Sequence, residues 1–386
     1  MVEISIRELR PGATQSGVRA FNERLLLTLL HRHGPTPSAD LAKRSELSAQ
    51  TVSNIVRKLE ADGLLLRGEP QRGRVGKPSI PMALNPGGAL SFGMKIGRRS
   101  ADLAVMNLYG EVLGQRQVTY RYPMPADIFG FLRDGMSDLS QTLTDDQNTR
   151  VCGIGIGAPF EIWRWTDAIG APKSFEVWRD VDFAEEVAQF SDLPLFTQND
   201  ATAACRAEYQ FGRGREFTDF AYFFVGSFIG GGIVMGSSVI EGSRNNAGAL
   251  GSLRSGSDSP LLDLASIYLL EAEIIKSGAD PSLLWQRPQD WSQFAEQLSP
   301  WVQRTANEIA KAARNACAVV DFEAVLIDGA FPESVRSDLV AQISTAMDNL
   351  DMRGIIRPRI EEARLDGNAR VIGAAAAPIF SQFLLT

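Results

Sequence analysis

The first 85 residues place apolar side chains at helical spacing in three short blocks, and each block has a candidate N-cap. The first block begins at Asn22, the second begins at Ser38 after a Pro-Thr-Pro break, and the third runs from Ser48 to Gly63. The apolar residues of the third block recur every three or four positions, so we expect one face of this helix to be buried. The residues of that face are Val52, Ile55, Val56 and Leu59.

Two extended segments follow the third block. They span residues 64–67 and 80–84 and flank a polar, glycine-containing loop at 72–78. Three helices and a two-stranded wing make a winged helix-turn-helix, in which the third helix enters the major groove of DNA. We place the end of this unit at residue 85, because the Asn-Pro-Gly-Gly stretch that begins there is typical of a linker.

The exposed face of the third helix carries side chains suited to DNA. Gln50 and Asn54 can each pair with adenine through two hydrogen bonds. Arg57 and Lys58 lie further along the helix and suit phosphate, and the basic wing loop suits a narrow minor groove. The predicted DNA-binding residues are Ser48, Gln50, Thr51, Ser53, Asn54, Arg57, Lys58, Arg72, Arg74 and Lys77. The alternative is a winged helix that contacts protein and has a solvated basic face.

The remaining chain repeats one order of strands. Residues 90–120 give three apolar strands separated by glycine turns, residues 220–243 repeat that order, and helical patterns follow each copy. Duplicated strand meanders with helices indicate an α/β body of two lobes that face a cleft. We expect lobe 1 at 86–200, completed by a C-terminal helix at 368–386, and lobe 2 at 201–367, which holds the effector cleft and an oligomerisation surface.

Charge and composition narrow the class of partner. The first 85 residues hold 13 Lys and Arg against 8 Asp and Glu, a net charge of +5, whereas the rest of the chain carries −12. A basic unit on an acidic body indicates that nucleic acid is met at one end only. No apolar run approaches the roughly 18 residues of a membrane span, and residues 1–10 are charged, so we expect a cytoplasmic protein without a membrane partner.

The three cysteines and two histidines show no metal-ligand spacing. Cys152, Cys205 and Cys317 lie far apart, and both histidines are near the N-terminus. We therefore predict free core thiols and no metal or cofactor.

Three glycine-rich segments resemble those of the ROK family (repressors, open reading frames and kinases). Residues 226–232 read GSFIGGG where the family's kinases have GTGIGGG, residues 246–252 read NAGALGS where they have NAGEIGH, and residues 151–160 read VCGIGIGAPF where the family has GIGIPG. The segment SELSAQTVSNIVRKLEADGLL and the later GRVGKP closely resemble the DNA-binding module of ROK repressors. The resemblance covers nearly the whole chain and implies an actin-like (RNase H-like) body of the sugar-kinase type behind the winged helix.

The segments that contact ATP in ROK kinases are altered. The family's DxGGT loop matches residues 95–99, where Lys95 stands in place of the metal-holding aspartate. A protonated lysine has no lone pair to offer magnesium. Phe228 stands in place of a glycine that faces phosphate, and Asp328 lies in the segment matching the adenosine-side GGG. We therefore expect no kinase activity; the alternative is an active sugar kinase with a DNA-binding appendage.

The resemblance also supplies a candidate effector site. In ROK kinases the aspartate of an Asn-Asp pair is the general base, and Asp200 matches it; as the alternative, Asp200 caps the helix that follows. The sugar-binding glutamate of NAGE is Ala249 here, the zinc-binding histidine of GH is Ser252, and Asp263 is a weak candidate for a later sugar-binding glutamate. The predicted effector-binding residues are Asn199, Asp200, Asn246, Gly248, Ala249 and Ser252.

Together these observations predict a DNA-binding regulator, in particular a repressor of carbohydrate uptake or catabolism genes. As a homodimer or homotetramer it would bind double-stranded operator DNA, and a sugar or sugar-like effector would bind in the body without being phosphorylated. A third alternative is a ligand-free DNA-binding protein whose body serves only oligomerisation.

Overall fold

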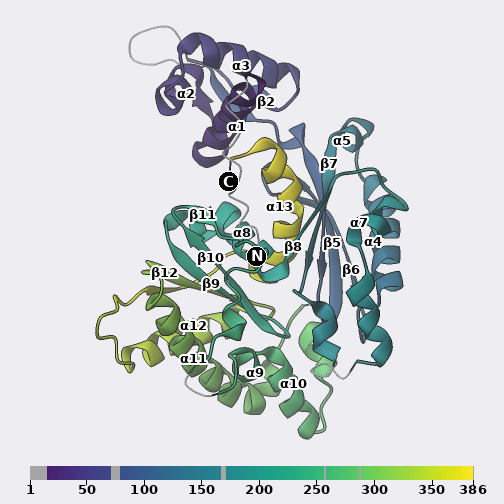
Figure 1. Ribbon diagram of the computed structural model, residues 1–386, viewed down its shortest axis with the longest axis vertical. Coiled ribbons are helices and arrows are strands. Elements are labelled where there is room, and N and C mark those ends of the chain that lie inside the picture. Colours follow the sequence, from purple (N-terminus) through teal and green to yellow (C-terminus); the bar gives the residue numbers. More distant parts are fainter. Residues whose placement is uncertain (1–14, 71–78, 167–170, 256–257, 287, 386) are drawn as a thin grey trace, which may run out of the picture.

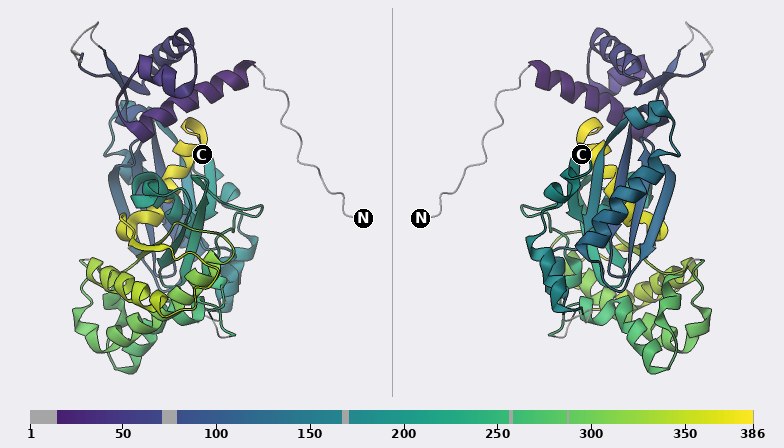
Figure 2. Two further views of the ribbon diagram at one scale, coloured as in Figure 1. Left: turned by 90° about the vertical axis from the view of Figure 1, so that its left-hand side faces the viewer. Right: turned by 90° about the vertical axis from the view of Figure 1, so that its right-hand side faces the viewer.

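The computed structural model describes residues 15–70, 79–166, 171–255, 258–286 and 288–385. A small N-terminal unit lies at one end of a two-lobed α/β body (Figure 1). Helix α1 crosses between this unit and the body, and its N-terminal part extends away from both (Figure 2). In the described ranges, no helix combines the length and the apolar character that crossing a membrane requires.

The N-terminal unit is a winged helix. Its elements are α1 (Gln15–His33), β1 (Thr36–Pro37), α2 (Ser38–Ser45), α3 (Ala49–Ala61), β2 (Leu65–Arg67) and β3 (Pro81–Leu84). The strands form one antiparallel sheet in the order β1-β3-β2. The four apolar residues predicted for the inner face of α3 are all buried.

Three local predictions for this unit were wrong. The described part of α1 begins at Gln15, so Asn22 lies inside the helix and is not its N-cap. Ser38 is the first residue of α2, and the cap position belongs to Pro37, which makes no side-chain hydrogen bond. Strand β1 was not predicted, because Thr36 and Pro37 were interpreted as a break between helices. Pro37 is tolerated in this strand because β1 lies at the edge of the sheet.

The two lobes of the body share one sheet topology. The first sheet has the order β6-β5-β4-β7-β8, and the second has the order β11-β10-β9-β12-β13. In each sheet the first three strands are antiparallel and the last two join in parallel. The repeated strand pattern of the sequence therefore corresponds to a repeated fold.

The first sheet is covered on both faces. Its strands are β4 (Leu90–Ile96), β5 (Ser100–Asn107), β6 (Val112–Thr119), β7 (Val151–Ala158) and β8 (Leu195–Asn199). Helices α4 (Pro125–Ser140) and α7 (Phe183–Ala188) lie on the outer side, and α13 (Ala369–Phe383) lies on the side that faces the second sheet (Figure 1). Helix α5 (Asp145–Thr149) lies at the end of the sheet toward the winged unit (Figure 1).

The second sheet carries the larger helical layer. Its strands are β9 (Phe220–Val225), β10 (Ile229–Met235), β11 (Ser238–Val239), β12 (Ala324–Gly329) and β13 (Arg359–Glu362). Helices α9 (Leu262–Ala265), α10 (Ile267–Lys276), α11 (Ala295–Cys317) and α12 (Glu333–Asp348) lie at the far end of the molecule from the winged helix (Figure 1).

Two helices lie between the sheets, and small residues let them approach closely. Helix α8 (Asp200–Phe211) packs on β10, where a Cβ added to Gly232 would lie 2.5 Å from Cβ of Cys205. Helix α13 packs on β7, where a Cβ added to Gly155 would lie 1.8 Å from the carbonyl oxygen of Ala374. The glycines of these strands thus make room for helices. In particular, Gly230, Gly231 and Gly232 all lie within β10. They therefore do not form a loop between two strands.

Candidate nucleic-acid interface and interlobe cavity

The third helix of the winged unit presents a row of exposed polar side chains. Ser48 caps it as predicted, and its Oγ accepts a hydrogen bond from the backbone N of Thr51 at 3.1 Å. Gln50, Ser53 and Asn54 are exposed, as is Arg57, whereas Thr51 is half-buried. Helix α3 lies on the side of the unit away from the body, which leaves this row open to a partner (Figure 1).

Hydrogen bonds within the row hold its side chains in place. Oδ1 of Asn54 accepts from Nε2 of Gln50 at 3.1 Å and from the guanidinium of Arg57. Nε of Arg57 also donates to the carbonyl oxygen of Ser53 at 3.3 Å. Asn54 is therefore the centre of a connected set of donors and acceptors one turn apart on the helix.

Lys58 lies off this row. Its Nζ is 2.7 Å from a carboxylate oxygen of Glu23 on α1 and 3.2 Å from one of Asp62, and the hydrogen bond that it donates to Glu23 raises the pKa of the lysine. Its ammonium thus pairs within the unit. The other predicted basic contacts, Arg72, Arg74 and Lys77, lie outside the described residues.

A cavity of about 180 Å³ lies between the two lobes. A volume of this size holds on the order of ten water molecules, which is enough for a small-molecule ligand. Five of the six predicted effector residues line it, namely Asn199, Asp200, Asn246, Ala249 and Ser252. Gly248 does not line the cavity. It has φ of +75°, and an added Cβ would lie 2.7 Å from Cα of Gly232, so this glycine allows its loop to pack closely on β10.

Asp200 and Arg370 pair at the edge of this cavity. Nη1 of Arg370 donates to Oδ2 of Asp200 at 3.2 Å, and the guanidinium lies 4.5 Å above the ring of Phe224. The helix cap is Asn199, whose Oδ1 accepts from the backbone N of Ala201 at 2.9 Å. The alternative interpretation of Asp200 as the N-cap was therefore wrong. Arg370 was not predicted, because the sequence around it resembles a purely packed, alanine-rich helix.

The rest of the cavity wall is largely apolar. Phe160, Ile162 and Phe175 line one part, and Phe224 and Phe228 line another. Asp263, the further sugar-binding candidate, does not line the cavity, and its carboxylate accepts a hydrogen bond from the hydroxyl of Tyr268 at 3.1 Å.

Lys95 is enclosed beneath the cavity. Its Nζ lies 2.7 Å from Oδ2 of Asp102 and donates to Oγ of Ser100 at 3.0 Å. Burial lowers the pKa of Lys95 to about 8, although the nearby Asp102 carboxylate opposes that shift. This position of the loop thus carries a buried, paired cation.

Next to Lys95, two arginines join the lobes. Arg98 and Arg99 precede β5 in the first lobe, and their guanidinium groups lie 3.0 Å and 3.3 Å from Oε2 of Glu271 on α10 in the second lobe. Nε1 of Trp285 donates to the other carboxylate oxygen at 2.7 Å. The only sequence signal for this contact was an acidic residue within the apolar helix IYLLEAEIIK.

Asp328 also occupies a different environment from the one predicted. The resemblance placed it in the segment that faces adenosine in the kinases, but its side chain is fully buried and accepts hydrogen bonds from Tyr222 and from the backbone N of Gly329, both at 2.7 Å. Burial raises the pKa of its carboxyl group to about 7.

The ends of α8 and α13 opposite the cavity contact the winged unit. Nε of Arg24 on α1 donates to the carbonyl oxygen of Leu384 at 2.9 Å, at the C-terminal end of α13. The ring of His31 lies edge-on to Phe211 at the end of α8 and to Phe380 on α13, with centroids 5.8 Å and 5.5 Å away. Burial, with the nearby charges of Arg215 and Arg32, lowers the pKa of His31 to about 3.

Comparison with known proteins gives two family matches. The ROK family model matches residues 91–260, and the MarR family model matches residues 22–70. A protein of Sinorhizobium fredii named y4fQ is 24% identical over 373 residues, which cover 94% of this chain and 92% of that protein. The xylose repressor of Bacillus subtilis is 22% identical over 273 residues, which cover 69% of this chain and 70% of the repressor.

Among solved structures, a ROK family transcriptional regulator described as a homologue of the Escherichia coli MLC protein superposes with a TM-score of 0.68. The two share 20% sequence identity, and the alignment covers 95% of this chain and 97% of the other. The likeness therefore extends over both the winged unit and the body, and it shows the fold.

Proposed function

We propose that this chain is a sugar-responsive transcriptional regulator whose affinity for operator DNA is set by an effector in the interlobe cavity, because the ROK family model matches residues 91–260 and the MarR family model matches residues 22–70. One observation carries the proposal. Helices α8 and α13 both begin at the cavity, at Asp200 and Ala369, and both end against helix α1 of the winged unit. Helices α8, α13 and α1 thus connect the interlobe cavity to the winged unit that carries the exposed row of α3.

The two helices belong to different lobes. Helix α8 packs on β10 of the second sheet, whereas α13 packs on β4 and β7 of the first. The pair between Asp200 and Arg370 therefore joins the lobes at the cavity. An effector that changes lobe closure would slide α8 along α13, and a slide of packed helices is a common form of conformational change.

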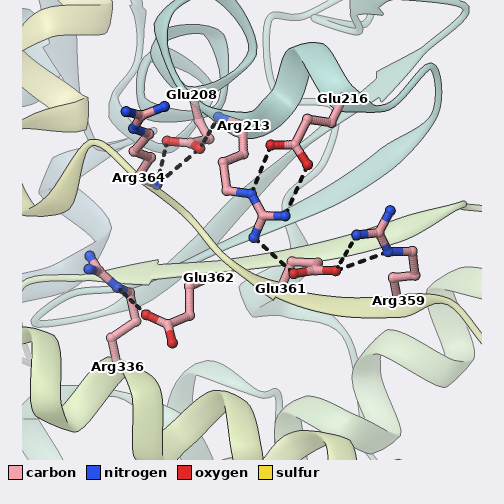
Figure 3. Close-up of polar contacts among 8 residues, drawn as sticks. All are labelled: Glu208, Arg213, Glu216, Arg336, Arg359, Glu361, Glu362 and Arg364. Atoms are coloured by element: carbon pink, nitrogen blue, oxygen red, sulfur yellow. Dashed lines mark hydrogen bonds and ion pairs between the residues drawn. The ribbon is translucent and has the colours of Figure 1, made fainter.

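The far end of α8 is fixed to the second lobe by a buried carboxylate. Glu208 accepts hydrogen bonds from the backbone N of Arg213 at 2.8 Å and of Arg364 at 3.0 Å, and Arg364 follows β13 (Figure 3). Arg213 in turn pairs with Glu361 on β13 at 2.8 Å (Figure 3). Because these contacts tie α8 to the second sheet, the helix moves with that lobe.

Helix α1 contacts both of the sliding helices at once. Arg24 bonds to the end of α13, and the ring of His31 lies between Phe211 of α8 and Phe380 of α13. At about 1.5 Å per residue, α8 and α13 carry a displacement over roughly 18 to 22 Å. We propose that this displacement shifts the position of α1, and with it α3. Effector binding and DNA binding would then be coupled by a free energy of about 1 to 3 kcal/mol.

On DNA, two winged units of a homodimer or homotetramer would bind a palindromic operator. Half-sites would lie about 10 bp, or a multiple of that spacing, apart. The exposed row on α3 supports this proposal, with Gln50 and Asn54 facing base edges and Arg57 facing phosphate. We further propose that the genes controlled concern carbohydrate uptake or catabolism.

We propose that the effector is bound and not phosphorylated. The carboxylate that would take a proton from a sugar hydroxyl, Asp200, accepts a hydrogen bond from Arg370. Lys95 can hold no metal ion while it is protonated, and Phe228 lies in the loop that would face phosphate.

The proposal is tested by selecting duplexes from a random library with the full chain at physiological salt. We expect enrichment of one motif with two-fold symmetry, and loss of that motif when Arg57→Ala and Asn54→Ala are combined. Recovery of random duplexes after repeated rounds would contradict the proposed function.

A further inference from the structure

The charges around the cavity do not balance. Among the described residues, the charged side chains that line it are Arg98, Asp200 and Arg370, two cations and one anion. Outside the wall, Lys95 and Asp102 pair with each other and add no net charge. In a poorly hydrated cleft an uncompensated charge interacts strongly with whatever ligand enters.

The carboxylate that pairs with Arg98 does not remove this excess. Glu271 is shared between Arg98 and Arg99, and its side chain is only 4% exposed. Two guanidinium groups thus depend on one carboxylate. Asp200 pairs with Arg370, so the site and its ion-pair partners together hold one more cation than anions.

Each of the two arginines that line the cavity also has one donor atom, Nε, without an acceptor. In the described part of the chain, three buried side-chain polar atoms have no hydrogen-bond partner, and two of them are Nε of Arg98 and Nε of Arg370. Each guanidinium has five N–H donors, and its plane suits carboxylate and phosphate oxygens. Unpartnered donors on these two residues indicate that the polar network of the cavity is completed by a further acceptor.

The backbone adds positive potential on the same side. Helix α8 begins at Asp200, and α13 begins at Ala369, next to Arg370. The N-terminus of a helix carries a partial positive charge, so both helices favour an anion in the cavity. At the position where the resembling kinases hold a sugar with a glutamate, this chain has Ala249, which removes a negative charge that would oppose such a ligand.

From these observations we infer that the effector is an anionic carbohydrate, a sugar that bears a carboxylate or a phosphate group, and that Arg370 selects for it. Asn199, Asn246 and Ser252 supply polar groups for hydroxyls, and the rings of Phe160 and Phe175 supply an apolar wall for the sugar face. This inference rests on the proposed function, since it assumes that the cavity is the effector site.

The test measures thermal stabilisation and calorimetric affinity of the full chain with charged sugars and their neutral parents. The probes are D-glucuronate, D-galacturonate and D-glucose 6-phosphate, compared with D-glucose and D-galactose at equal concentration. We expect at least one charged probe to raise the melting temperature by several degrees and to bind about tenfold or more tightly than its parent. The uronates and the sugar phosphate distinguish the two sources of the anionic group.

Variants separate the charge from the shape of the site. Arg370→Gln should lower the affinity for the charged probe roughly tenfold to a hundredfold and leave the affinity for the neutral parent sugar unchanged. Since this substitution leaves Asp200 unpaired, the double variant Asp200→Asn/Arg370→Gln serves as a second test that carries no unpaired charge. Arg353→Gln is the matched control, because Arg353 is exposed and pairs only locally with Asp351.

Three results would overturn the inference: equal binding of charged and neutral sugars, equal stabilisation by inorganic phosphate alone, or no stabilisation by any charged probe. Operator binding is assayed separately without ligand. If operator binding is specific but neutral sugars are preferred, only the inference fails. If a charged sugar binds but no operator is recognised, the proposed regulatory function is contradicted, whereas the preference of the cavity for an anionic sugar is supported.

Discussion

Nη1 of Arg370 donates a hydrogen bond to Oδ2 of Asp200 at 3.2 Å, and this pair joins the first turn of α13 to the first turn of α8. Both side chains are largely buried, with exposures of 12% and 16%. The pair therefore links the two lobes at the point where an effector would bind.

This pair should behave as a coupled unit in unfolding. Asp200→Asn and Arg370→Gln should each lower the free energy of unfolding by about 1 to 3 kcal/mol, because each leaves a largely buried partner charge without its counterpart. The double variant should lose less than the sum of the two, by about 0.5 to 3 kcal/mol. Urea denaturation of the four proteins measures this cycle, and strict additivity would show that the pair carries no coupling.

Acid should loosen the contact between α1 and the body through His31. The pKa of His31 is about 3 in the folded chain and near 6.5 when unfolded, so between these values only the unfolded state takes up the proton. Stability should therefore fall as the pH falls below 6.5, with a contribution from His31 of about 1.4 kcal/mol per pH unit.

Substitution isolates this contribution. The free energy of unfolding, measured from pH 6.5 to pH 5, should depend less steeply on pH in His31→Leu than in the parent chain. His33→Gln is the comparison, because His33 is exposed on the same helix and the pKa of its ring is lowered less, so this variant should change the slope less than His31→Leu does. A parallel pH dependence in His31→Leu and the parent chain would rule out a buried neutral His31.

Arg24 should hold the winged unit on α13. Its guanidinium bonds to the carbonyl oxygen of Leu384, and the backbone N of Leu385 donates to Oγ1 of Thr28 at 2.8 Å. Arg24→Ala should lower the free energy of unfolding by about 1 to 2 kcal/mol, since it leaves carbonyl groups at the end of α13 without a cationic donor. It should also speed hydrogen exchange in the last turn of α13.

Arg19→Ala provides the comparison for Arg24. Arg19 lies on the same helix but is 65% exposed, and its ion-pair partner within the described part of the chain is Glu23. Its removal should change neither the exchange of α13 nor, beyond about 0.5 kcal/mol, the stability. Equal exchange in Arg24→Ala and the parent chain would show that this contact does not hold the two parts together.

The exposed row of α3 should divide into base contacts and phosphate contacts. Arg57→Ala should weaken binding to all duplexes alike and reduce the dependence of affinity on salt. Gln50→Ala and Asn54→Ala should relax base preference at single positions, at about 1 to 3 kcal/mol each. Asn54→Ala should have the larger effect, because Asn54 accepts hydrogen bonds from both neighbours. Uniform losses in all three variants would mean that another face reads the bases.

The body should not transfer phosphate from ATP. In a coupled assay with a broad sugar panel we expect no turnover above background, because Lys95 pairs with Asp102 where a metal-holding carboxylate would be needed. Turnover that disappears in Asp200→Asn would instead support a sugar kinase with a DNA-binding appendage.

Local patterns allowed much of this fold to be predicted. Ser48 and the spacing of Val52, Ile55, Val56 and Leu59 predicted α3. Both the N-cap and the buried face of a helix depend on residues that are close together in the sequence. The repeated strand order likewise predicted the two lobes. By contrast, a two-residue strand such as β1 has no periodicity of its own and exists only through its pairing with β3.

The electrostatics of the cavity could be predicted only in part. Asp200 and Asn199 were found because they occupy a motif, and the structure does place both at the cavity. Arg370 lies 170 residues from Asp200 in the chain, and Glu271 lies 173 residues from Arg98. Contacts at such separations depend on the packing of two lobes, so no local pattern identifies the partner.

Binding to DNA from upstream of the chain's own gene tests the central claim most directly. Fluorescence anisotropy at physiological salt, against an excess of scrambled duplex, gives the ratio of specific to non-specific affinity. The account predicts a ratio above roughly a thousand. Equal affinity for the scrambled duplex, with binding that vanishes as salt rises, would reveal only attraction to phosphate and would contradict the proposed regulator.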